Sequence, residues 1–597
     1  MNNVGENPEF SLNANVRLDY NPVKDLLLSA IGAYTYTNGE ERTYRSTMKL
    51  SGDRVLGPSE LKHKMGKTIY KTFQATAEYN KTIGEHTFGI LAGYSWEQED
   101  YRYVQGSRDK FPGNDLPYLN AGSPDNQKSE GTGNAWAIQS GFGRLRYNFN
   151  ERYLFESTVR YDGSSRFPQS KKFGFFPSVA AGWRLSEENF FKENESLGFI
   201  SNLKLKVSWG RLGNQNIGNY PYQSVYELGQ NYPFGDTYTQ GAAVTTAVDP
   251  TIKWEETETI DGGLEAVFWN GLLSVNASYF NRRTYDILYK PSGSVSTILG
   301  QKISEMNTGE LKNFGWEFEV GHRNKIGDVS YNVNANLSII KNKLTTLGVG
   351  NVEQLNGMVG NGSDLFIGYP IQMYYGYVSD GVFLDENDIK SWYDQSKVTP
   401  NPQPGDIRYK DISGPDGVPD GKIDPNYDRV YLGSRIPKFT FGLNLGVEYK
   451  GLDLSVLLQG VAGVTGMLDG FAGWAFRGDG NIQKWQAEGR FDPANPTRYP
   501  AYPRLEDLSN STTPNIVTSD FWTQDASYIR LKNIQLGYTF PKKMLQAAKI
   551  SNLRVYVQAE NPLCWNKYKP GWDPEINTSG NYYPILATYT FGVNFKF

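Results

Sequence analysis

The sequence predicts an all-β protein, folded as one large antiparallel transmembrane β-barrel with short turns at one rim and long loops at the other. Three observations predict this fold. Apolar and polar residues alternate over many segments, short and long connections join these segments, and aromatic residues recur beside the short connections.

The alternation gives each segment one apolar face and one polar face. In residues 329–339 (VSYNVNANLSI), every second residue is apolar or aromatic, and each residue between is Ser or Asn. The same division holds in residues 203–209, 441–450 and 553–560. We count roughly seventeen such segments and find little helical periodicity, so each strand is expected to turn its apolar face to lipid and its polar face to a lumen.

The connections fall into two classes, as the two rims of a membrane barrel require. Short connections lie at residues 20–25, 148–152, 269–271 and 449–451. Long connections rich in Gly, Asn and Pro lie near residues 105–133, 213–250, 343–437 and 461–525. Six aromatic residues stand at or just before short connections, where the interfacial girdle of a barrel belongs: Tyr20, Tyr79, Tyr147, Trp269, Tyr449 and Phe540.

The last nine residues, 589–597 (YTFGVNFKF), alternate in the same way, so the chain ends inside a strand. In hydrocarbon every strand edge must be paired, which favours a closed barrel. The ending also resembles the C-terminal assembly signal of bacterial outer-membrane barrels, with Gly592, Phe595 and Phe597 as the matching residues. This resemblance implies the barrel assembly machinery as a partner.

Composition excludes several other classes of protein. The chain has 597 residues, a net charge of -4 and no basic stripe, so we expect no nucleic-acid partner. One cysteine, Cys564, leaves no intramolecular disulfide, and no apolar run reaches the length of about 18 residues that a spanning helix needs. The three histidines lie far apart and suggest no catalytic group, so we expect no enzyme.

Several blocks of sequence resemble the barrel of TonB-dependent transporters of the SusC/RagA type. The blocks are residues 160–167 (RYDGSSRF), 176–188 (FPSVAAGWRLSEE), 205–223 (LKVSWGRLGNQNIGNYPYQ), 252–268, 405–411 (GDIRYKD), 437–460 and 526–541. They follow the order of the family from about residue 135 to the end of the chain. Upstream of them, the sequence resembles barrel strands in general.

The resemblance implies energised import of an oligosaccharide or a peptide across the outer membrane of a Gram-negative, Bacteroidota-like bacterium. It implies a plug domain inside the barrel, a SusD-like surface lipoprotein as a lid, outer-membrane lipid around the wall, and opening by the TonB complex.

The chain departs from that pattern. We find no plug, no TonB-contacting segment and no signal peptide, and the predicted strands number roughly 17 of 22. Residues 1–597 are therefore expected to be the C-terminal part of such a barrel, which meets TonB through a missing N-terminal part and is inactive alone. Two alternatives stay open: a passive porin-like or vestigial barrel fragment, and a soluble all-β binding or adhesive protein.

Candidate ligand contacts are aromatic residues on the long loops, because aromatic faces stack on sugar rings and on peptide side chains. The candidates are Tyr232, Tyr238, Trp474, Phe476, Trp485, Tyr499 and Tyr502. The same residues would also serve to pack loops on one another or on a lid protein.

One acidic stretch, residues 411–424 (DISGPDGVPDGKID), is the candidate metal site. Asp411, Asp416, Asp420 and Asp424 are hard oxygen ligands separated by Gly and Pro, which suits Ca²⁺. The spacing matches an EF-hand loop only in part, so a solvated acidic turn is the alternative. No cofactor is expected to be required.

Overall fold

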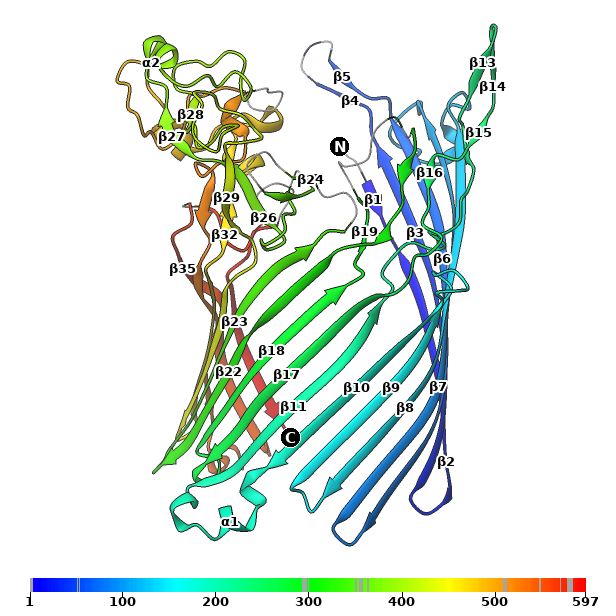
Figure 1. The fold of residues 1–597 in the computed structure, drawn as a ribbon, viewed down its shortest axis with the longest axis vertical. Helices are drawn as coiled ribbons and strands as arrows, with labels where there is room; N and C mark the ends of the chain where they lie inside the picture. The colour runs from blue at the N-terminus through cyan, green and yellow to red at the C-terminus, as the bar shows by residue number, and fades with distance from the viewer. Residues whose placement is uncertain are drawn as a thin grey trace.

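The computed structural model describes residues 4–597 apart from 51, 53, 292–297, 299, 349–351, 354–357, 362–363, 508–512, 547–548, 570 and 577–582. Within these residues one large antiparallel sheet dominates, as the sequence predicts (Figure 1). No helix in the described part of the chain has both the length and the hydropathy that crossing a membrane demands.

The large sheet is made of long strands that follow one another along the chain. They are β1 (Val4–Glu6), β2 (Glu9–Val23), β3 (Leu26–Arg45), β6 (Glu60–Ile83), β7 (His86–Asp109), β8 (Lys128–Phe149), β9 (Tyr153–Ser164), β10 (Phe173–Arg184), β11 (Ile200–Asn214), β17 (Glu255–Phe268), β18 (Leu273–Tyr285), β22 (Glu310–Ile326), β23 (Val329–Thr346), β30 (Phe439–Tyr449), β31 (Leu452–Ala462), β34 (Tyr528–Thr539), β35 (Asn552–Asn566) and β36 (Thr588–Lys596).

Each strand pairs antiparallel with the next long strand along the chain, from β2 through to β36. Strand β1 shares the neighbour β3 with β2, so the 18 strands fill 17 positions in the sheet. The predicted number of strands is confirmed. Among the pairings of the described residues, none joins β36 to β1 or β2, so the curved sheet is open between these edges.

The two rims differ as the sequence predicts. The short connections at residues 24–25, 84–85, 150–152, 327–328 and 450–451 gather at the bottom of Figure 1. Short helices complete this rim: η2 (Leu185–Glu187), α1 (Asn189–Lys192), η3 (Glu195–Leu197), η4 (Trp269–Gly271) and α5 (Lys542–Leu545). The predicted girdle residues Tyr20, Tyr79, Tyr147, Trp269, Tyr449 and Phe540 lie at this end of their strands.

The opposite rim carries the long loops, at the top of Figure 1. Several of them form small two-stranded ladders: β4 (Met48–Lys49) with β5 (Val55–Leu56), β12 (Glu227–Leu228) with β15 (Ala242–Ala243), β13 (Tyr232–Phe234) with β14 (Thr237–Thr239), β16 (Thr246–Ala247) with β20 (Lys302–Ile303), β19 (Leu288–Tyr289) with β21 (Met306–Asn307), and β24 (Val352–Glu353) with β25 (Val359–Gly360). The 3-10 helix η1 (Leu119–Ala121) lies between β7 and β8.

The register of the sheet separates an apolar face from a polar face. Neighbouring strands β17, β18, β22 and β23 align one apolar row: Leu264, Ala277, Phe318 and Leu337. One residue further along each strand, the aligned row is Glu265, Asn276, Glu319 and Asn336. Because successive strand residues point to opposite faces, the first row lies on the outer, lipid-facing wall and the second on the lumenal wall.

The C-terminal strand β36 pairs with β35 along its whole length, from Thr588 to Lys596. Gly592 lies opposite Tyr556, and a Cβ atom placed on Gly592 would come within 2.2 Å of the Tyr556 ring. The ring therefore covers the glycine, which explains the glycine inside this otherwise aromatic strand. Whether Gly592, Phe595 and Phe597 act as an assembly signal stays a prediction.

Replacing Leu337 with Arg tests the assignment of the two faces. Leu337 lies in the apolar row near mid-strand, so the charge should lower the free energy of unfolding from a lipid bilayer by roughly 2–4 kcal/mol. Asn336→Arg places the same side chain on the lumenal wall and should change stability by less than about 1 kcal/mol. Urea titration in bilayers measures both values. An equal loss in the two variants would contradict the assignment.

Candidate functional site

Three long loops fold together into a compact unit above one side of the sheet, which we call the cap. It comprises the described residues of 369–437, 463–526 and 567–576, at the upper left of Figure 1. Its elements are β26 (Met373–Tyr377), β27 (Ser379–Val382), α2 (Glu386–Ser391), β28 (Ile407–Tyr409), β29 (Arg429–Ser434), β32 (Thr465–Met467), α3 (Gly470–Gly473), η6 (Arg477–Asp479), α4 (Lys484–Gly489), η8 (Pro514–Ile516) and β33 (Thr523–Asp525).

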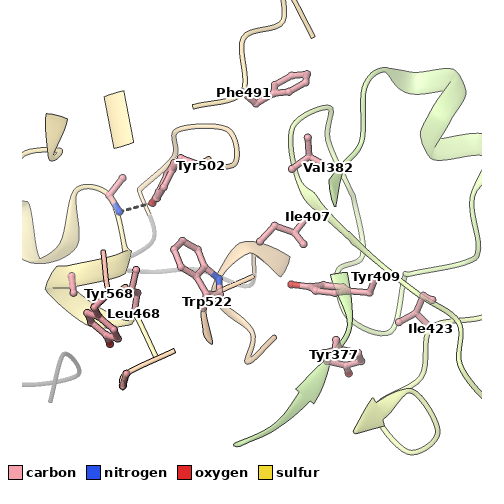
Figure 2. Close-up of a cluster of buried hydrophobic side chains, with 13 residues drawn as sticks. Tyr377, Val382, Ile407, Tyr409, Ile423, Leu468, Phe491, Tyr502, Trp522 and Tyr568 are labelled. Carbon is pink, nitrogen blue, oxygen red and sulfur yellow. Dashed lines mark hydrogen bonds between the residues drawn. The ribbon is translucent and has the colours of Figure 1, made fainter. Parts of the chain in front are cut away.

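The cap has a hydrophobic core of its own. Figure 2 shows Tyr377, Ile407 and Tyr409 from the first loop beside Tyr502 and Trp522 from the second. Tyr409, Tyr502 and Trp522 are all 1% exposed or less. Tyr502 packs edge-on against Trp522, with ring centroids 5.8 Å apart. This core makes the cap a folded unit rather than a set of independent loops.

Buried polar groups cross-link the first two loops of the cap. Asn515 accepts a hydrogen bond from the Ile407 N–H at 2.8 Å and donates one to Asp406 at 2.8 Å. Arg504 forms an ion pair with the same Asp406 carboxylate, whose side chain is 1% exposed. Burial raises the pKa of Asp406, even though these donors favour its charged form.

A second cross-link centres on Asp388, at the start of α2. Its carboxylate accepts a hydrogen bond from Arg408 of the first loop at 3.0 Å and one from Arg498 of the second loop at 3.1 Å. Asp388 therefore links the two loops. Burial acts to raise the pKa of Asp388, but the hydrogen bonds from Arg498 and the Leu384 N–H and the two arginine charges outweigh it, and the pKa is lowered. The guanidinium of Arg408 also lies 3.7 Å from the Trp392 ring centroid.

The third loop fastens the cap to the barrel wall. Arg530 of β34 is 3% exposed and forms ion pairs with Asp573 at 2.7 Å and with Glu575 at 2.8 Å. Tyr568, five residues before Asp573, belongs to the core of the cap. Lys569 lies 4.1 Å above the ring of Trp485 on α4. The cap therefore holds a fixed position on strands β34 and β35.

Three of the predicted ligand aromatics lie against the cap interior. Tyr502 is fully buried, and its hydroxyl accepts a hydrogen bond from the Ala475 N–H at 2.9 Å. Trp485 packs on Tyr502, and its indole N–H donates to Gln483 at 2.9 Å. Trp474 is half-buried, and its indole N–H finds no hydrogen-bond acceptor among the described residues. In this structure Tyr502 offers no surface to a ligand.

The other four predicted aromatics are exposed. Tyr499 is 75% exposed and Phe476 is 37% exposed, both on the second loop of the cap. Tyr232 and Tyr238 lie on the β13–β14 ladder, which rises above the rim on the opposite side in Figure 1. The structure therefore does not gather the seven predicted residues into one site, and a ligand-binding role for the exposed four stays a prediction.

The acidic stretch folds as a tight loop at the edge of the cap. Asp411 accepts a hydrogen bond from the Gly421 N–H at 2.6 Å, and Asp424 pairs with Lys397. Asp416 and Asp420 are exposed. The described residues contain no group of three or more His, Cys, Asp or Glu side chains arranged to hold a metal ion, and Ca²⁺ binding by this loop stays a prediction.

A cavity of about 590 Å³ opens at the long-loop rim, away from the cap. Arg166, Asn216, Leu288, Tyr289 and Lys290 line it. The Arg166 guanidinium stacks over Trp136, 5.2 Å from the ring centroid, and Trp136 donates to Glu99 on the lumenal wall. No pattern in the sequence pointed to this cavity, because its lining residues come from segments far apart along the chain.

Known proteins similar to this chain include TonB-dependent receptors of two bacteria. The family described as "TonB dependent receptor-like, beta-barrel" matches residues 2–561. The TonB-dependent receptor P3 of Formosa agariphila is 27% identical over 100% of this chain and 59% of its own length. The TonB-dependent receptor SusC of Bacteroides thetaiotaomicron is 28% identical over 100% of this chain and 56% of its own length.

A solved structure of the RagAB peptide importer in the 'open-open' state shares the fold, with a TM-score of 0.81 at 24% identity. The alignment covers 100% of this chain and 62% of that chain. This chain therefore spans a little over half the length of the curated relatives described above.

Asp388→Asn should unfold the cap locally while the barrel stays intact. The change removes the charged partner of Arg498 and one of the two carboxylate partners of Arg408, which keeps Asp380, so the cost should be roughly 1–3 kcal/mol. Because the pKa of Asp388 is lowered, its contribution should also fade in the original protein as pH falls below about 4. Hydrogen exchange of residues 378–410 and 491–507 measures both effects.

Glu488→Gln is the matched control, since Glu488 pairs with Lys484 on the exposed side of α4. Its removal should change the exchange rates little. Unchanged protection in Asp388→Asn would contradict the role of this cross-link.

Proposed function

This chain belongs to the TonB-dependent receptor-like β-barrel family, and from this premise we propose that it forms the barrel of an outer-membrane importer for an oligosaccharide or a peptide. The observation that carries the proposal is the folded cap, which stands over one side of the curved sheet, above its polar face. A rigid mouth of this kind selects a solute before it enters the lumen, whereas a passive pore has no need of one.

The exposed aromatics of the cap are the proposed first contacts for the nutrient. Tyr499 and Phe476 project from loops whose backbone is held by the buried core and by the Asp388 and Asp406 cross-links. A contact residue on a rigid support loses little conformational entropy when it binds. Stacking on a sugar ring or on a peptide side chain is the interaction that such a residue offers.

The proposed partners follow from the same function. A SusD-like surface lipoprotein would cover the long-loop rim, the TonB complex would supply energy from the opposite side, and the barrel assembly machinery would insert the wall into lipid. The relative SusC is a TonB-dependent receptor, and the fold shared with the RagAB peptide importer supports the comparison. A Ca²⁺ ion on the acidic loop of the cap is a further, separate proposal that import does not require.

Growth on a single nutrient tests the proposal in the bacterium that carries this gene. Deletion should abolish growth on either a starch-derived oligosaccharide mixture or a tryptic digest of casein, and should leave growth on glucose intact. Uptake should also stop when the proton gradient of the inner membrane is collapsed, because a TonB-driven importer needs that energy. Uptake that persists without the gradient would favour a passive pore.

Two tyrosines of the cap provide matched variants for the same assay. Tyr499→Ala should raise the half-saturating nutrient concentration roughly threefold to tenfold and leave the cap folded, since this ring is exposed. Tyr502→Ala should instead loosen the cap, because it removes a buried ring and the acceptor for the Ala475 N–H. Full uptake affinity in Tyr499→Ala and Phe476→Ala together would remove these residues from the proposed contact surface.

A further inference from the structure

A row of cations crosses three neighbouring strands on the outer wall of the barrel. Arg283 of β18 lies directly opposite Lys312 of β22, and Lys312 lies directly opposite Lys343 of β23. Directly paired residues point to the same face, and their Cβ atoms are about 5 Å apart. Lys341 lies two residues before Lys343 on β23 and therefore shares this face. We call these four residues the cationic row.

The cationic row lies on the lipid-facing side. Below it, the same strands align Asn281 with Phe314, and then Tyr279 with Trp316 and Ile339. Further down, the row of Phe318 and Leu337 belongs to the apolar band described above. Each step of two residues is about 7 Å along a strand, so Arg283, Lys312 and Lys343 stand one step above Phe314, while Lys341 lies level with it. Tyr285 stands one step above Arg283 on the same face.

The four cations of the row outnumber the carboxylates beside them, which are Glu310 and, directly opposite Arg283 on β17, Glu258. Glu310 pairs with Arg283 at 2.5 Å and lies 3.9 Å from Lys312. Lys341 and Lys343 are exposed and form no ion pair with any residue that the structure describes. On the side away from β22, strand β30 begins its pairing only at Ile339 with Phe439, and beside Lys343 the loop residues Gly368 and Tyr369 hydrogen-bond to the Leu344 backbone.

Like charges placed directly opposite one another destabilise a sheet. An anion that lies against such a row reduces the repulsion and adds charge-assisted hydrogen bonds. Lys and Arg near a membrane surface also extend their aliphatic stems along apolar side chains while their charged ends reach the headgroup level. Phe314 and Trp316 provide that apolar surface here.

We propose that the cationic row of Arg283, Lys312, Lys341 and Lys343 binds the phosphate groups of a lipid headgroup in the outer leaflet of the membrane. The position of the row favours a lipid over a free phosphate ion: the cations stand immediately above the side chains that meet the acyl chains, where a headgroup phosphate lies. The inference rests on the proposed outer-membrane location, and it adds a specific lipid contact on the wall that import itself does not require.

The test uses the protein extracted from its own membrane and placed in detergent micelles doped with lipid A. Binding of diphosphorylated lipid A is measured by native mass spectrometry and compared with that of enzymatically dephosphorylated lipid A. The original protein should bind the diphosphorylated lipid at least tenfold more tightly. Lys312→Gln/Lys343→Gln should weaken this binding roughly thirtyfold, as expected for two cations that each contribute about 1 kcal/mol near an anionic lipid.

Lys325→Gln is the matched control, because Lys325 lies on the same strand β22 at the opposite rim, and it should bind like the original protein. Lys312→Arg/Lys343→Arg keeps the charges and should retain binding, which separates loss of charge from loss of fold. Equal binding of both lipid forms, or unchanged binding by the Gln double variant, would overturn the proposal.

Competition by inorganic phosphate distinguishes a lipid site from a site for free anions. Competition by millimolar inorganic phosphate as effective as competition by the lipid would identify a site for free anions and would also overturn the proposal. If the original protein binds diphosphorylated lipid A as expected but imports no nutrient, the result counts against the proposed function alone. The two failures are therefore distinguishable.

Discussion

The structure depends on one constraint, the pairing of every backbone N–H and C=O that lies in hydrocarbon. In lipid an unpaired group has no water to bond, so the chain must place its spanning residues in one continuous antiparallel ladder. The consecutive pairing from β2 to β36 satisfies this constraint for the strands between the two open edges of the sheet. The register that it fixes then decides which side chains meet lipid and which line the lumen. The apolar row through Leu337 and the polar row through Asn336 are its direct result.

Local pattern was sufficient to predict the wall. The period of two over residues 329–339 reappears as β23, and the short connection at residues 449–451 reappears as the turn between β30 and β31. These features depend on residues close in sequence, where alternation and turn composition act directly. The family blocks also predicted the relationship that the match over residues 2–561 confirms.

The cap could not be predicted in the same way. Its core joins residues more than a hundred positions apart, such as Ile407 and Asn515, whose hydrogen bond spans 108 positions. Loop aromatics therefore look alike in the sequence, although Tyr502 forms part of a core and Tyr499 faces solvent. The one available signal was the mixture of Trp, Tyr and apolar residues in residues 463–526, which exceeds what a solvated loop requires. In the cap, the burial of an aromatic residue, and not its type, decides whether it stabilises the core or is accessible to a ligand.

The ion pairs of Arg530 connect the cap to the register of strand β34. Arg530 belongs to β34, and its partners Asp573 and Glu575 belong to the loop that leads into the C-terminal strand. A slip of one residue between β34 and its neighbours would turn Arg530 from the lumenal to the lipid-facing side and separate it from both carboxylates. The third loop would then keep its contacts with the cap core through Tyr568 but lose its ion pairs with the wall. The ion pairs between the cap and the wall therefore form only in the native register of β34, which couples the alignment of this strand to the position of the third loop.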